Sequence, residues 1–332
     1  MNSGAEPTIK FSIDNHTMTV MANDFVPIKP YDAEIVTLAV GQRTDVVVQA
    51  KGSAGDSSWM RSTFDSACSD TNSFYGLAAV YYEDANTMAA PRSIGYEIPP
   101  NLACTNDPLN MTEPAFSMTP SEPATTLELR MDLAPNASLS RLWTMNNSSF
   151  YSDLNSPVML EAIHGNDTFG SMRNVFNMGS NGSVRLIMYN DYRGGLDADH
   201  RGTLTADAIF LASHPMHLHG HDFWVLAEGQ GVWDGKIMNP QNPQRRDTQQ
   251  IASHYTDTTP TYTVLQWVQD NPGVWPFHCH VAWHLSAGMY INIMESPADM
   301  EKFQVPDDVL GTCDTWKQWQ KDHYTSQVDS GV

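Results

Sequence analysis

The 332-residue sequence is poor in positive charge, and it contains neither a long apolar run nor a Cys-x-x-Cys pair. Its 18 Lys and Arg stand against 38 Asp and Glu, which gives a formal net charge of -20. Nucleic acids and anionic membrane surfaces bind basic patches, so this balance argues against both as partners. A transmembrane helix is excluded because it needs a run of about eighteen apolar residues. The composition fits an acidic extracellular protein.

The sequence also lacks a secretory signal peptide, because no basic stretch followed by an apolar stretch opens it. Seven Asn-x-Ser/Thr sequons nevertheless favour secretion, since such acceptors lie on surface loops of secreted proteins. The sequons begin at Asn15, Asn110, Asn136, Asn146, Asn147, Asn166 and Asn181. A secreted type of sequence without its signal leads us to expect that the chain begins within a longer protein.

Two short segments concentrate the side chains that bind metal ions. Residues 278–289 read His-Cys-His-Val-Ala-Trp-His-Leu-Ser-Ala-Gly-Met, and residues 214–221 read His-Pro-Met-His-Leu-His-Gly-His. A Cys, two His and a weak axial Met are the ligands of a blue copper site. Cys279, His284 and Met289 supply three of them, and we expect the fourth from residues 214–221. Structural zinc sites favour Cys-x-x-Cys arrangements, which makes zinc the weaker choice.

A histidine stands on each side of Cys279. Successive side chains of a strand point to opposite faces, so His278 and His280 should face away from the metal that Cys279 binds. His217 and His219 alternate in the same way. The pattern therefore predicts a second metal centre behind the first, joined to it through a few covalent bonds.

These two segments resemble copper motifs of the multicopper oxidases, and the surrounding sequence resembles fungal laccases of the ascomycete type. The resemblance implies these ligands: for type 1 copper His214, Cys279, His284 and axial Met289; for type 2 copper His217; for type 3 copper His219, His278 and His280. His221 matches no ligand, and we interpret it as structural. Ascomycete-type laccases commonly have Leu where this chain has Met289, and a thioether there is expected to lower the type 1 potential.

The resemblance further implies a copper oxidoreductase that oxidises phenols or aromatic amines at type 1 copper and reduces O₂ to water at a trinuclear cluster, with lignin degradation among the roles of the family. His284 would receive the electron and Cys279 would pass it inward. Glu6 matches a carboxylate that accepts the phenolic proton, which is worth roughly 10²–10⁴-fold in rate where such help operates. Phe210 and Trp143 would line the same pocket.

The histidine count limits this reading. Multicopper oxidases take two further His-x-His pairs from a first domain, and the sequence holds only the pairs 217/219 and 278/280. We therefore expect four cluster histidines and an N-terminal domain to be missing, and the chain alone to be inactive. The alternative is a non-enzymatic, cupredoxin-like copper-binding or electron-transfer protein.

With Cys279 assigned to copper, Cys68 and Cys104 can pair across a Pro-rich segment, which suits an oxidising compartment. Cys313 is then left over and needs a partner. In ascomycete-type laccases a cysteine of this tail is bonded to the first domain, which makes that missing domain the expected partner. A tail similar to 329–332 enters the channel toward the trinuclear cluster in those laccases.

Short apolar/polar alternations separated by turn residues predict an all-β fold of sandwich or barrel domains. By resemblance these are cupredoxin-like Greek-key domains. We expect residues 1–90 to be the C-terminal part of a second domain, 91–125 a connector, and 126–300 a third domain with the copper motifs. Residues 301–332 should begin with a helix, because apolar residues recur at helical spacing after Asp307 and Asp308. The resemblance implies that they end in a plug-like tail.

Overall fold

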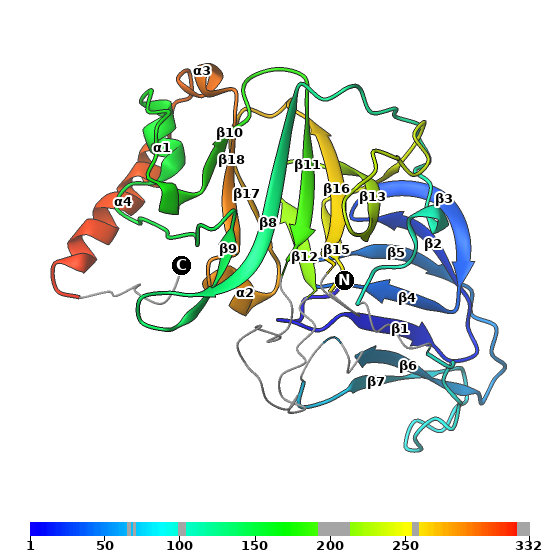
Figure 1. The fold of residues 1–332 in the computed structure, drawn as a ribbon. Coiled ribbons are helices and arrows are strands. Elements are labelled where there is room, and N and C mark those ends of the chain that lie inside the picture. Colours follow the sequence, from blue (N-terminus) through cyan, green and yellow to red (C-terminus); the bar gives the residue numbers. More distant parts are fainter. Residues whose placement is uncertain (65–67, 69–70, 99–103, 192–212, 254–258, 324–332) are drawn as a thin grey trace, which may run out of the picture.

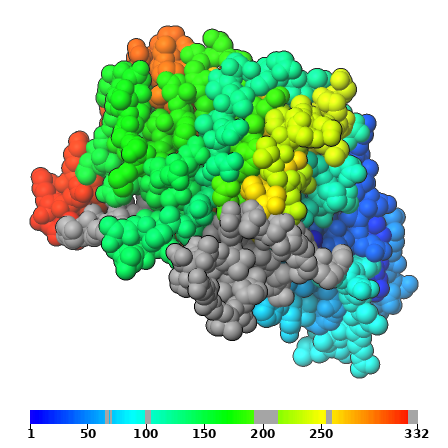
Figure 2. All heavy atoms as spheres, in the orientation of Figure 1, coloured from blue at the N-terminus to red at the C-terminus, as the bar shows by residue number. Residues whose placement is uncertain are grey.

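The computed structural model describes residues 1–332 except 65–67, 69–70, 99–103, 192–212, 254–258 and 324–332. Two groups of β-sheets lie side by side, one formed by the N-terminal strands and one by the strands that follow residue 124 (Figure 1). Figure 2 shows the N-terminal strands on one side of the molecule and the C-terminal segment on the other. The all-β prediction with a C-terminal helix is confirmed.

The N-terminal region packs a four-stranded antiparallel sheet against a three-stranded one. The first has the order β4 (Ile35–Leu38), β1 (Ile9–Ile13), β6 (Ser57–Phe64) and β7 (Tyr75–Tyr81). The second has the order β3 (Val26–Ala33), β2 (Met18–Asn23) and β5 (Thr44–Val48). Met18 and Val20 of β2 alternate with more exposed residues, and they form a small core with Ile28 and Val36.

The second region is a larger sandwich. One sheet has the order β14 (Gln244–Arg246), β13 (Phe223–Gln230), β16 (Thr261–Val268), β11 (Ser183–Asn190), β8 (Thr125–Pro135) and β9 (Arg141–Met145). The other has the order β10 (Val175–Asn177), β18 (Tyr290–Glu295), β17 (Gly273–Cys279), β12 (His214–Leu218) and β15 (Thr248–Ile251). Between them lies the main core, built around fully buried side chains such as Trp267, Phe223 and Phe277.

Helices are few and short. They are α1 (Val158–Ile163), α2 (Ala282–Ser286), α3 (Pro297–Met300) and α4 (Asp307–Gln320), with 3₁₀ turns η1 (Leu109–Met111) and η2 (Ser171–Arg173). Helix α4 begins at Asp307, as the two acidic residues predicted. Negative charges in the first turn stabilise a helix because they interact favourably with the positive end of its dipole. In the described part of the chain, no helix is long and apolar enough to cross a membrane.

Between β7 and β8 the described residues form η1 and an isolated bridge from Pro114 to Ile28. Cys68 and Cys104 form the predicted disulfide, with their Cα atoms 5.5 Å apart. The domain boundaries at residues 90, 125 and 300 stay predictions. Phe210 and the tail residues 329–332 lie outside the described residues.

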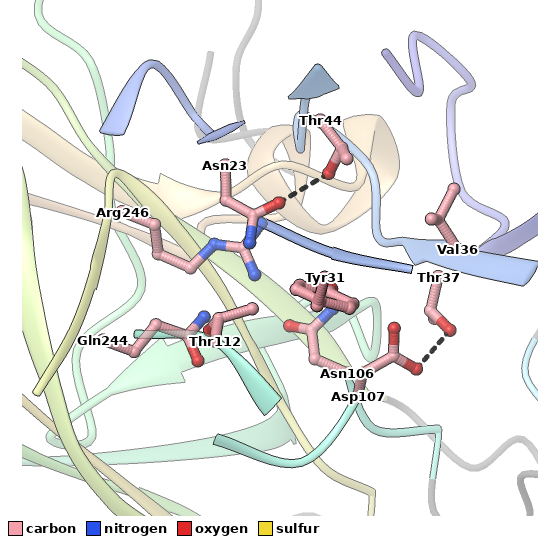
Figure 3. Close-up of a pocket in the computed structure, with 10 residues that line it drawn as sticks. All are labelled: Asn23, Tyr31, Val36, Thr37, Thr44, Asn106, Asp107, Thr112, Gln244 and Arg246. Atoms are coloured by element: carbon pink, nitrogen blue, oxygen red, sulfur yellow. Dashed lines mark hydrogen bonds between the residues drawn. The ribbon is translucent and has the colours of Figure 1, made fainter. Parts of the chain in front are cut away.

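Charged side chains join the two regions. Arg246, in β14, donates to Asp24 with a nitrogen–oxygen distance of 2.7 Å, and Arg43 binds both carboxylate oxygens of Asp247 at 2.7 and 2.6 Å. Asp24 also accepts the Arg43 backbone N–H at 2.7 Å. Beside these pairs is a polar cavity of about 20 Å³, lined by Arg246, Asn106 and Asp107 among others (Figure 3). A space of this size and polarity suits a single water molecule.

Candidate metal centre

Strands β12 and β17 are antiparallel neighbours, and their register sorts the histidines onto two faces. Met216 lies opposite Cys279, and His217 lies opposite His278. Because side chains alternate along a strand, Cys279 and Met216 point into the core between the two sheets, while His217 and His278 point away from it. Cys279 and Met216 are both fully buried in that core.

Three donor atoms converge on the core side. The Cys279 Sγ lies 3.7 Å from His214 Nδ1 and 3.4 Å from His284 Nδ1, and the two Nδ1 atoms are 3.1 Å apart. Donors at about 2.0–2.3 Å from one ion in a trigonal plane stand about 3.4–4.0 Å apart. We call these residues, with Met289, the inner set. In the described part of the chain, His214, Cys279 and His284 are the one group of three or more His, Cys or carboxylate donors whose atoms all lie within 4.8 Å of one another.

The chemistry of the inner set fits a soft metal ion. Burial holds the pKa of His214 well below its usual value and lowers the pKa of His284 to about 4, so both imidazoles are neutral and able to coordinate. Burial also raises the pKa of the Cys279 thiol, so a cation is needed to hold a thiolate there. A thiolate with two imidazoles is the donor set of a blue copper site.

A tight loop after α2 brings Met289 back to Cys279. The Met289 N–H donates to the His284 carbonyl at 3.0 Å, and the Cys279 N–H donates to the Met289 carbonyl at 3.2 Å. Gly288 has φ +99°, and a Cβ on it would lie 2.0 Å from Ser149 Oγ. Only glycine fits this position, and the loop holds the buried Met289 in the core that contains Cys279.

The other face of the same strands carries four histidines. Ring centroids are 4.7 Å apart for His217 and His219, 5.2 Å for His219 and His278, and 5.8 Å for His278 and His280. His217 and His280 close the ring at 5.8 Å. We call these four residues the outer set. The Nε2 atoms of His219 and His278 are 3.1 Å apart, but no three of the four residues have donor atoms within 4.8 Å of one another, as expected if they divide among several ions.

Backbone carbonyls orient two of these rings. His217 Nδ1 lies 2.8 Å from the Asp247 carbonyl, and His278 Nδ1 lies 2.9 Å from the Cys279 carbonyl. A carbonyl only accepts, so each Nδ1 carries the proton and each Nε2 is free to coordinate. Burial lowers the pKa of His278 to about 4, which keeps that ring neutral.

The N-terminal region supports the outer set directly. Gly41 has φ +84°, and a Cβ there would lie 2.4 Å from the His280 ring. Burial would raise the pKa of Asp247, but hydrogen bonds from Arg43, His217 and Thr248 hold it well below its usual range. No local pattern reveals this role, because the partner Arg43 is about two hundred residues away.

The remaining predicted residues surround the inner set. Trp143 is buried, with its ring 4.6 Å from the His214 ring and 4.7 Å from the His284 ring. Glu6 accepts a hydrogen bond from the Trp283 indole at 3.1 Å, beside His284 in the sequence. The Ala282 N–H donates to the Ala5 carbonyl at 3.0 Å, which fixes the N-terminal segment against α2.

His221 belongs to neither set. Its Nε2 lies 3.2 Å from Oε2 of the buried Glu295, whose Oε1 accepts the Trp267 indole N–H at 2.6 Å. Its Nδ1 lies 3.1 Å from the His219 carbonyl. These contacts link the end of β12 to β18 and to the core.

A β-sandwich whose neighbouring strands, together with α2, place a Cys/His₂ set on one side and four imidazoles on the other defines a cupredoxin-like copper protein. Family comparison agrees, because models described as "Multicopper oxidase" match residues 1–85 and 135–299. The chain belongs to the multicopper oxidase family. Membership implies copper binding.

The chain is similar to fungal laccases over its full length. It is 29% identical to Laccase-2 of Botryotinia fuckeliana over 340 residues and 30% identical to Laccase-1 of Melanocarpus albomyces over 356 residues. It covers 54% and 53% of those proteins, so it spans about half the length of the curated relatives it matches.

Among solved structures, a variant of the Botrytis aclada laccase matches with a TM-score of 0.84 and 29% identity, over 100% of this chain and 57% of that one. The multicopper oxidase Fet3p, described as functioning in iron import, matches with a TM-score of 0.77 at 20% identity, over 100% of this chain and 60% of that one. The second match shows the fold alone.

Proposed function

We propose that this chain is part of a laccase-type copper oxidase that oxidises phenols or aromatic amines and reduces O₂ to water. His214, Cys279 and His284 are the type 1 ligands, with Met289 axial. His217 is a type 2 ligand, and His219, His278 and His280 are type 3 ligands. The observation that carries the proposal is the back-to-back placement of the two sets around Cys279.

Copper supplies one-electron chemistry at the inner set and multi-electron oxygen reduction at the outer set. The chain's own residues separate these tasks. Cys279 and Met289 are packed in the main core and His214 is fully buried, which holds the inner set rigidly, and a rigid site changes geometry little on electron transfer. Cys279 connects it to His278 and His280 through adjacent peptide units, and the hydrogen bond from His278 to the Cys279 carbonyl adds a second contact.

Glu6 has the proposed role of accepting the substrate proton. Its carboxylate accepts a hydrogen bond from the indole of Trp283, the α2 residue that precedes His284. A carboxylate at this position would take the phenolic proton as the electron leaves toward His284. In a longer protein that includes two additional His-x-His pairs, Glu6→Gln should therefore lower kcat/KM for a phenol without changing the blue absorption. A non-phenolic one-electron donor is the control substrate that should be unaffected.

Four further cluster histidines and the N-terminal domain that carries them are proposed to lie outside this chain. Cys313, a free cysteine in α4, is the proposed disulfide partner of that N-terminal domain. Secretion is also proposed. All seven sequon asparagines are at least partly exposed, as glycan acceptors must be.

Two experiments test the function. Copper-reconstituted chain should show an intense blue thiolate-to-copper band, whereas oxygen uptake with a phenol should be near zero until a protein that includes two additional His-x-His pairs is assayed. Preferential zinc uptake, or bound copper without the blue band, would overturn the type 1 assignment. If no in-frame His-x-His pairs precede Met1 in the genomic sequence, the oxidase function of this product is wrong, and electron transfer by the inner set remains.

A further inference from the structure

A separate cleft lies at the edge of the six-stranded sheet. Strand β14 pairs with β13 only as far as Val225, and beyond it the segment Ala227–Gln230 lines two adjoining lobes of about 520 and 260 Å³. Both lobes share Pro108, Glu228 and Tyr262. We call this space the Glu228 cleft. No residue of the inner or outer set lines it.

Three segments distant in the sequence form its walls. They are the residues around η1, the end of β13, and the loop that carries Ile237. Gly229 helps to shape the cleft, because a Cβ on it would lie 2.8 Å from the Tyr262 hydroxyl oxygen. The apolar wall residues of the larger lobe are Leu109, Ala227, Ile237, Met238 and Tyr262. A volume of about 300–1,000 Å³ with mostly apolar walls is typical of sites for small organic molecules.

Glu228 is the acidic group deepest in this cleft. One of its oxygens accepts a hydrogen bond from the Gln249 side-chain amide at 3.1 Å. Burial raises the pKa of Glu228 to about 7, against the opposing effects of Gln249 and of the more distant Arg246 charge. The cation on the cleft wall, Lys236, lies 2.6 Å from the Asp234 carboxylate and is neutralised there. Within the described residues, Glu228 therefore has no ion-pair partner.

A desolvated carboxylate with no ion-pair partner, beside the apolar wall of the larger lobe, is complementary to an organic cation. A bound ammonium group would supply the missing charge, and charge-assisted hydrogen bonds in such surroundings are about twice as strong as neutral ones. A divalent metal ion fits poorly, because calcium and magnesium need about six oxygen ligands. An anion would be repelled by both Glu228 and Asp234.

We propose that the Glu228 cleft binds a small primary ammonium compound with an apolar body, with the ammonium group on the Glu228 carboxylate and the body against Ile237 and Tyr262. This site is independent of the proposed copper chemistry, because no residue of the inner or outer set lines it.

Isothermal titration calorimetry on the full chain without copper tests the proposal. The probes are 2-phenylethylamine, its neutral counterpart 2-phenylethanol, and the anion 3-phenylpropionate, at about pH 8, where the amine is still protonated and Glu228 is ionised. We expect the amine to bind at least about tenfold more tightly than the alcohol, and the anion not to bind. Equal binding of amine and alcohol, or no binding of the amine, would overturn the proposal.

Variants locate the bound amine. Glu228→Gln should weaken it by at least about tenfold, because the amide keeps the shape and removes the charge. Asp314→Asn, at an exposed carboxylate of α4, is the matched control and should leave the affinity unchanged. Ile237→Lys should also abolish binding by placing a tethered ammonium in the cleft, which keeps the test decisive if Glu228→Gln fails to fold. An amine affinity that survives Glu228→Gln but falls in Glu6→Gln would place binding beside α2 and overturn the proposal.

Discussion

The inner and outer sets are built around the same two strands, yet they differ in burial and in the spread of their donor atoms. The inner donor atoms of His214, Cys279 and His284 lie 3.1 to 3.7 Å apart, with His284 supplied by α2. In the outer set the Nε2 atoms of His219 and His278 are 3.1 Å apart, but no three of its residues have donor atoms within 4.8 Å of one another. His219 is exposed while His278 is buried. The inner donors therefore form one compact group, whereas the outer donors are spread over a wider space.

This difference shows what each site depends on. The inner set depends mainly on the C-terminal sandwich, because Cys279 and Met289 are packed in its core and His214 is fully buried there. The outer set depends on other parts of the molecule, since Gly41 contacts His280 and Asp247 is fixed by Arg43. Damage to the core should therefore affect the inner set, and damage to the interface between the two regions should affect the outer set.

The largest expected effect is that of Cys279→Ser. Without the thiolate, the blue band of the copper-loaded chain should disappear completely, because that band arises from the copper–thiolate bond. Cys313→Ser, which removes the free cysteine of α4, should leave the band intact. Absorption spectra of the two reconstituted variants make the comparison. A blue Cys279→Ser protein would contradict the inner-set assignment.

The second-largest effect is expected for Asp247→Asn. It removes the charge that binds Arg43 through two hydrogen bonds, and we expect a loss of about 2–3 kcal/mol in the free energy of unfolding. The exposed pair of Arg130 and Asp191 offers a control, since Asp191→Asn should cost less than about 1 kcal/mol. Urea denaturation measures both. If the two costs are equal, the contact between Asp247 and Arg43 does not stabilise the interface between the two regions.

Gly41→Ala and Gly55→Ala separate backbone strain from contact with His280. Both glycines have positive φ, +84° and +89°, but a Cβ at Gly55 meets nothing within 4 Å, whereas one at Gly41 meets the His280 ring. We expect Gly41→Ala to cost about 1–2 kcal/mol more than Gly55→Ala in the free energy of unfolding. Copper binding at the outer set should weaken in Gly41→Ala alone, with the blue band retained. Identical behaviour of the two variants would show that His280 tolerates the shift.

Met289→Leu should have the smallest effect on structure, because the two side chains have similar volumes and the position is buried in the core. The blue band should persist, and the reduction potential of the inner set should rise, since an axial thioether lowers it. Redox titration of the reconstituted chain measures the shift. An unchanged potential would mean that the Met289 sulfur does not contact the metal.

Much of the site could be predicted from sequence because it is encoded locally. The alternation His278-Cys279-His280 specifies two faces on any strand, and the strand is present. The same holds for α4, whose acidic first turn and apolar spacing are local signals. The disulfide between Cys68 and Cys104 could be predicted because the sequence has few cysteines to pair.

Contacts between residues far apart in the chain could not be predicted from the sequence. No local sequence pattern indicates that Asp247 binds Arg43 or that Gly41 contacts His280. Nor does one indicate that Glu228 lies in a cleft lined by the residues around η1. The position of Glu6 against Trp283 also required the fold, because 277 residues separate them.

The sequence by itself determined the metal chemistry, since ligand identity and the two-residue period of a strand are properties of adjacent residues. Only the tertiary structure decided that His214 and Cys279 are fully buried with His284 partly exposed beside them, while the outer set lies against the N-terminal region. That outcome depends on which sheets pack together, and packing is set by burial and charge pairing between residues far apart in the chain.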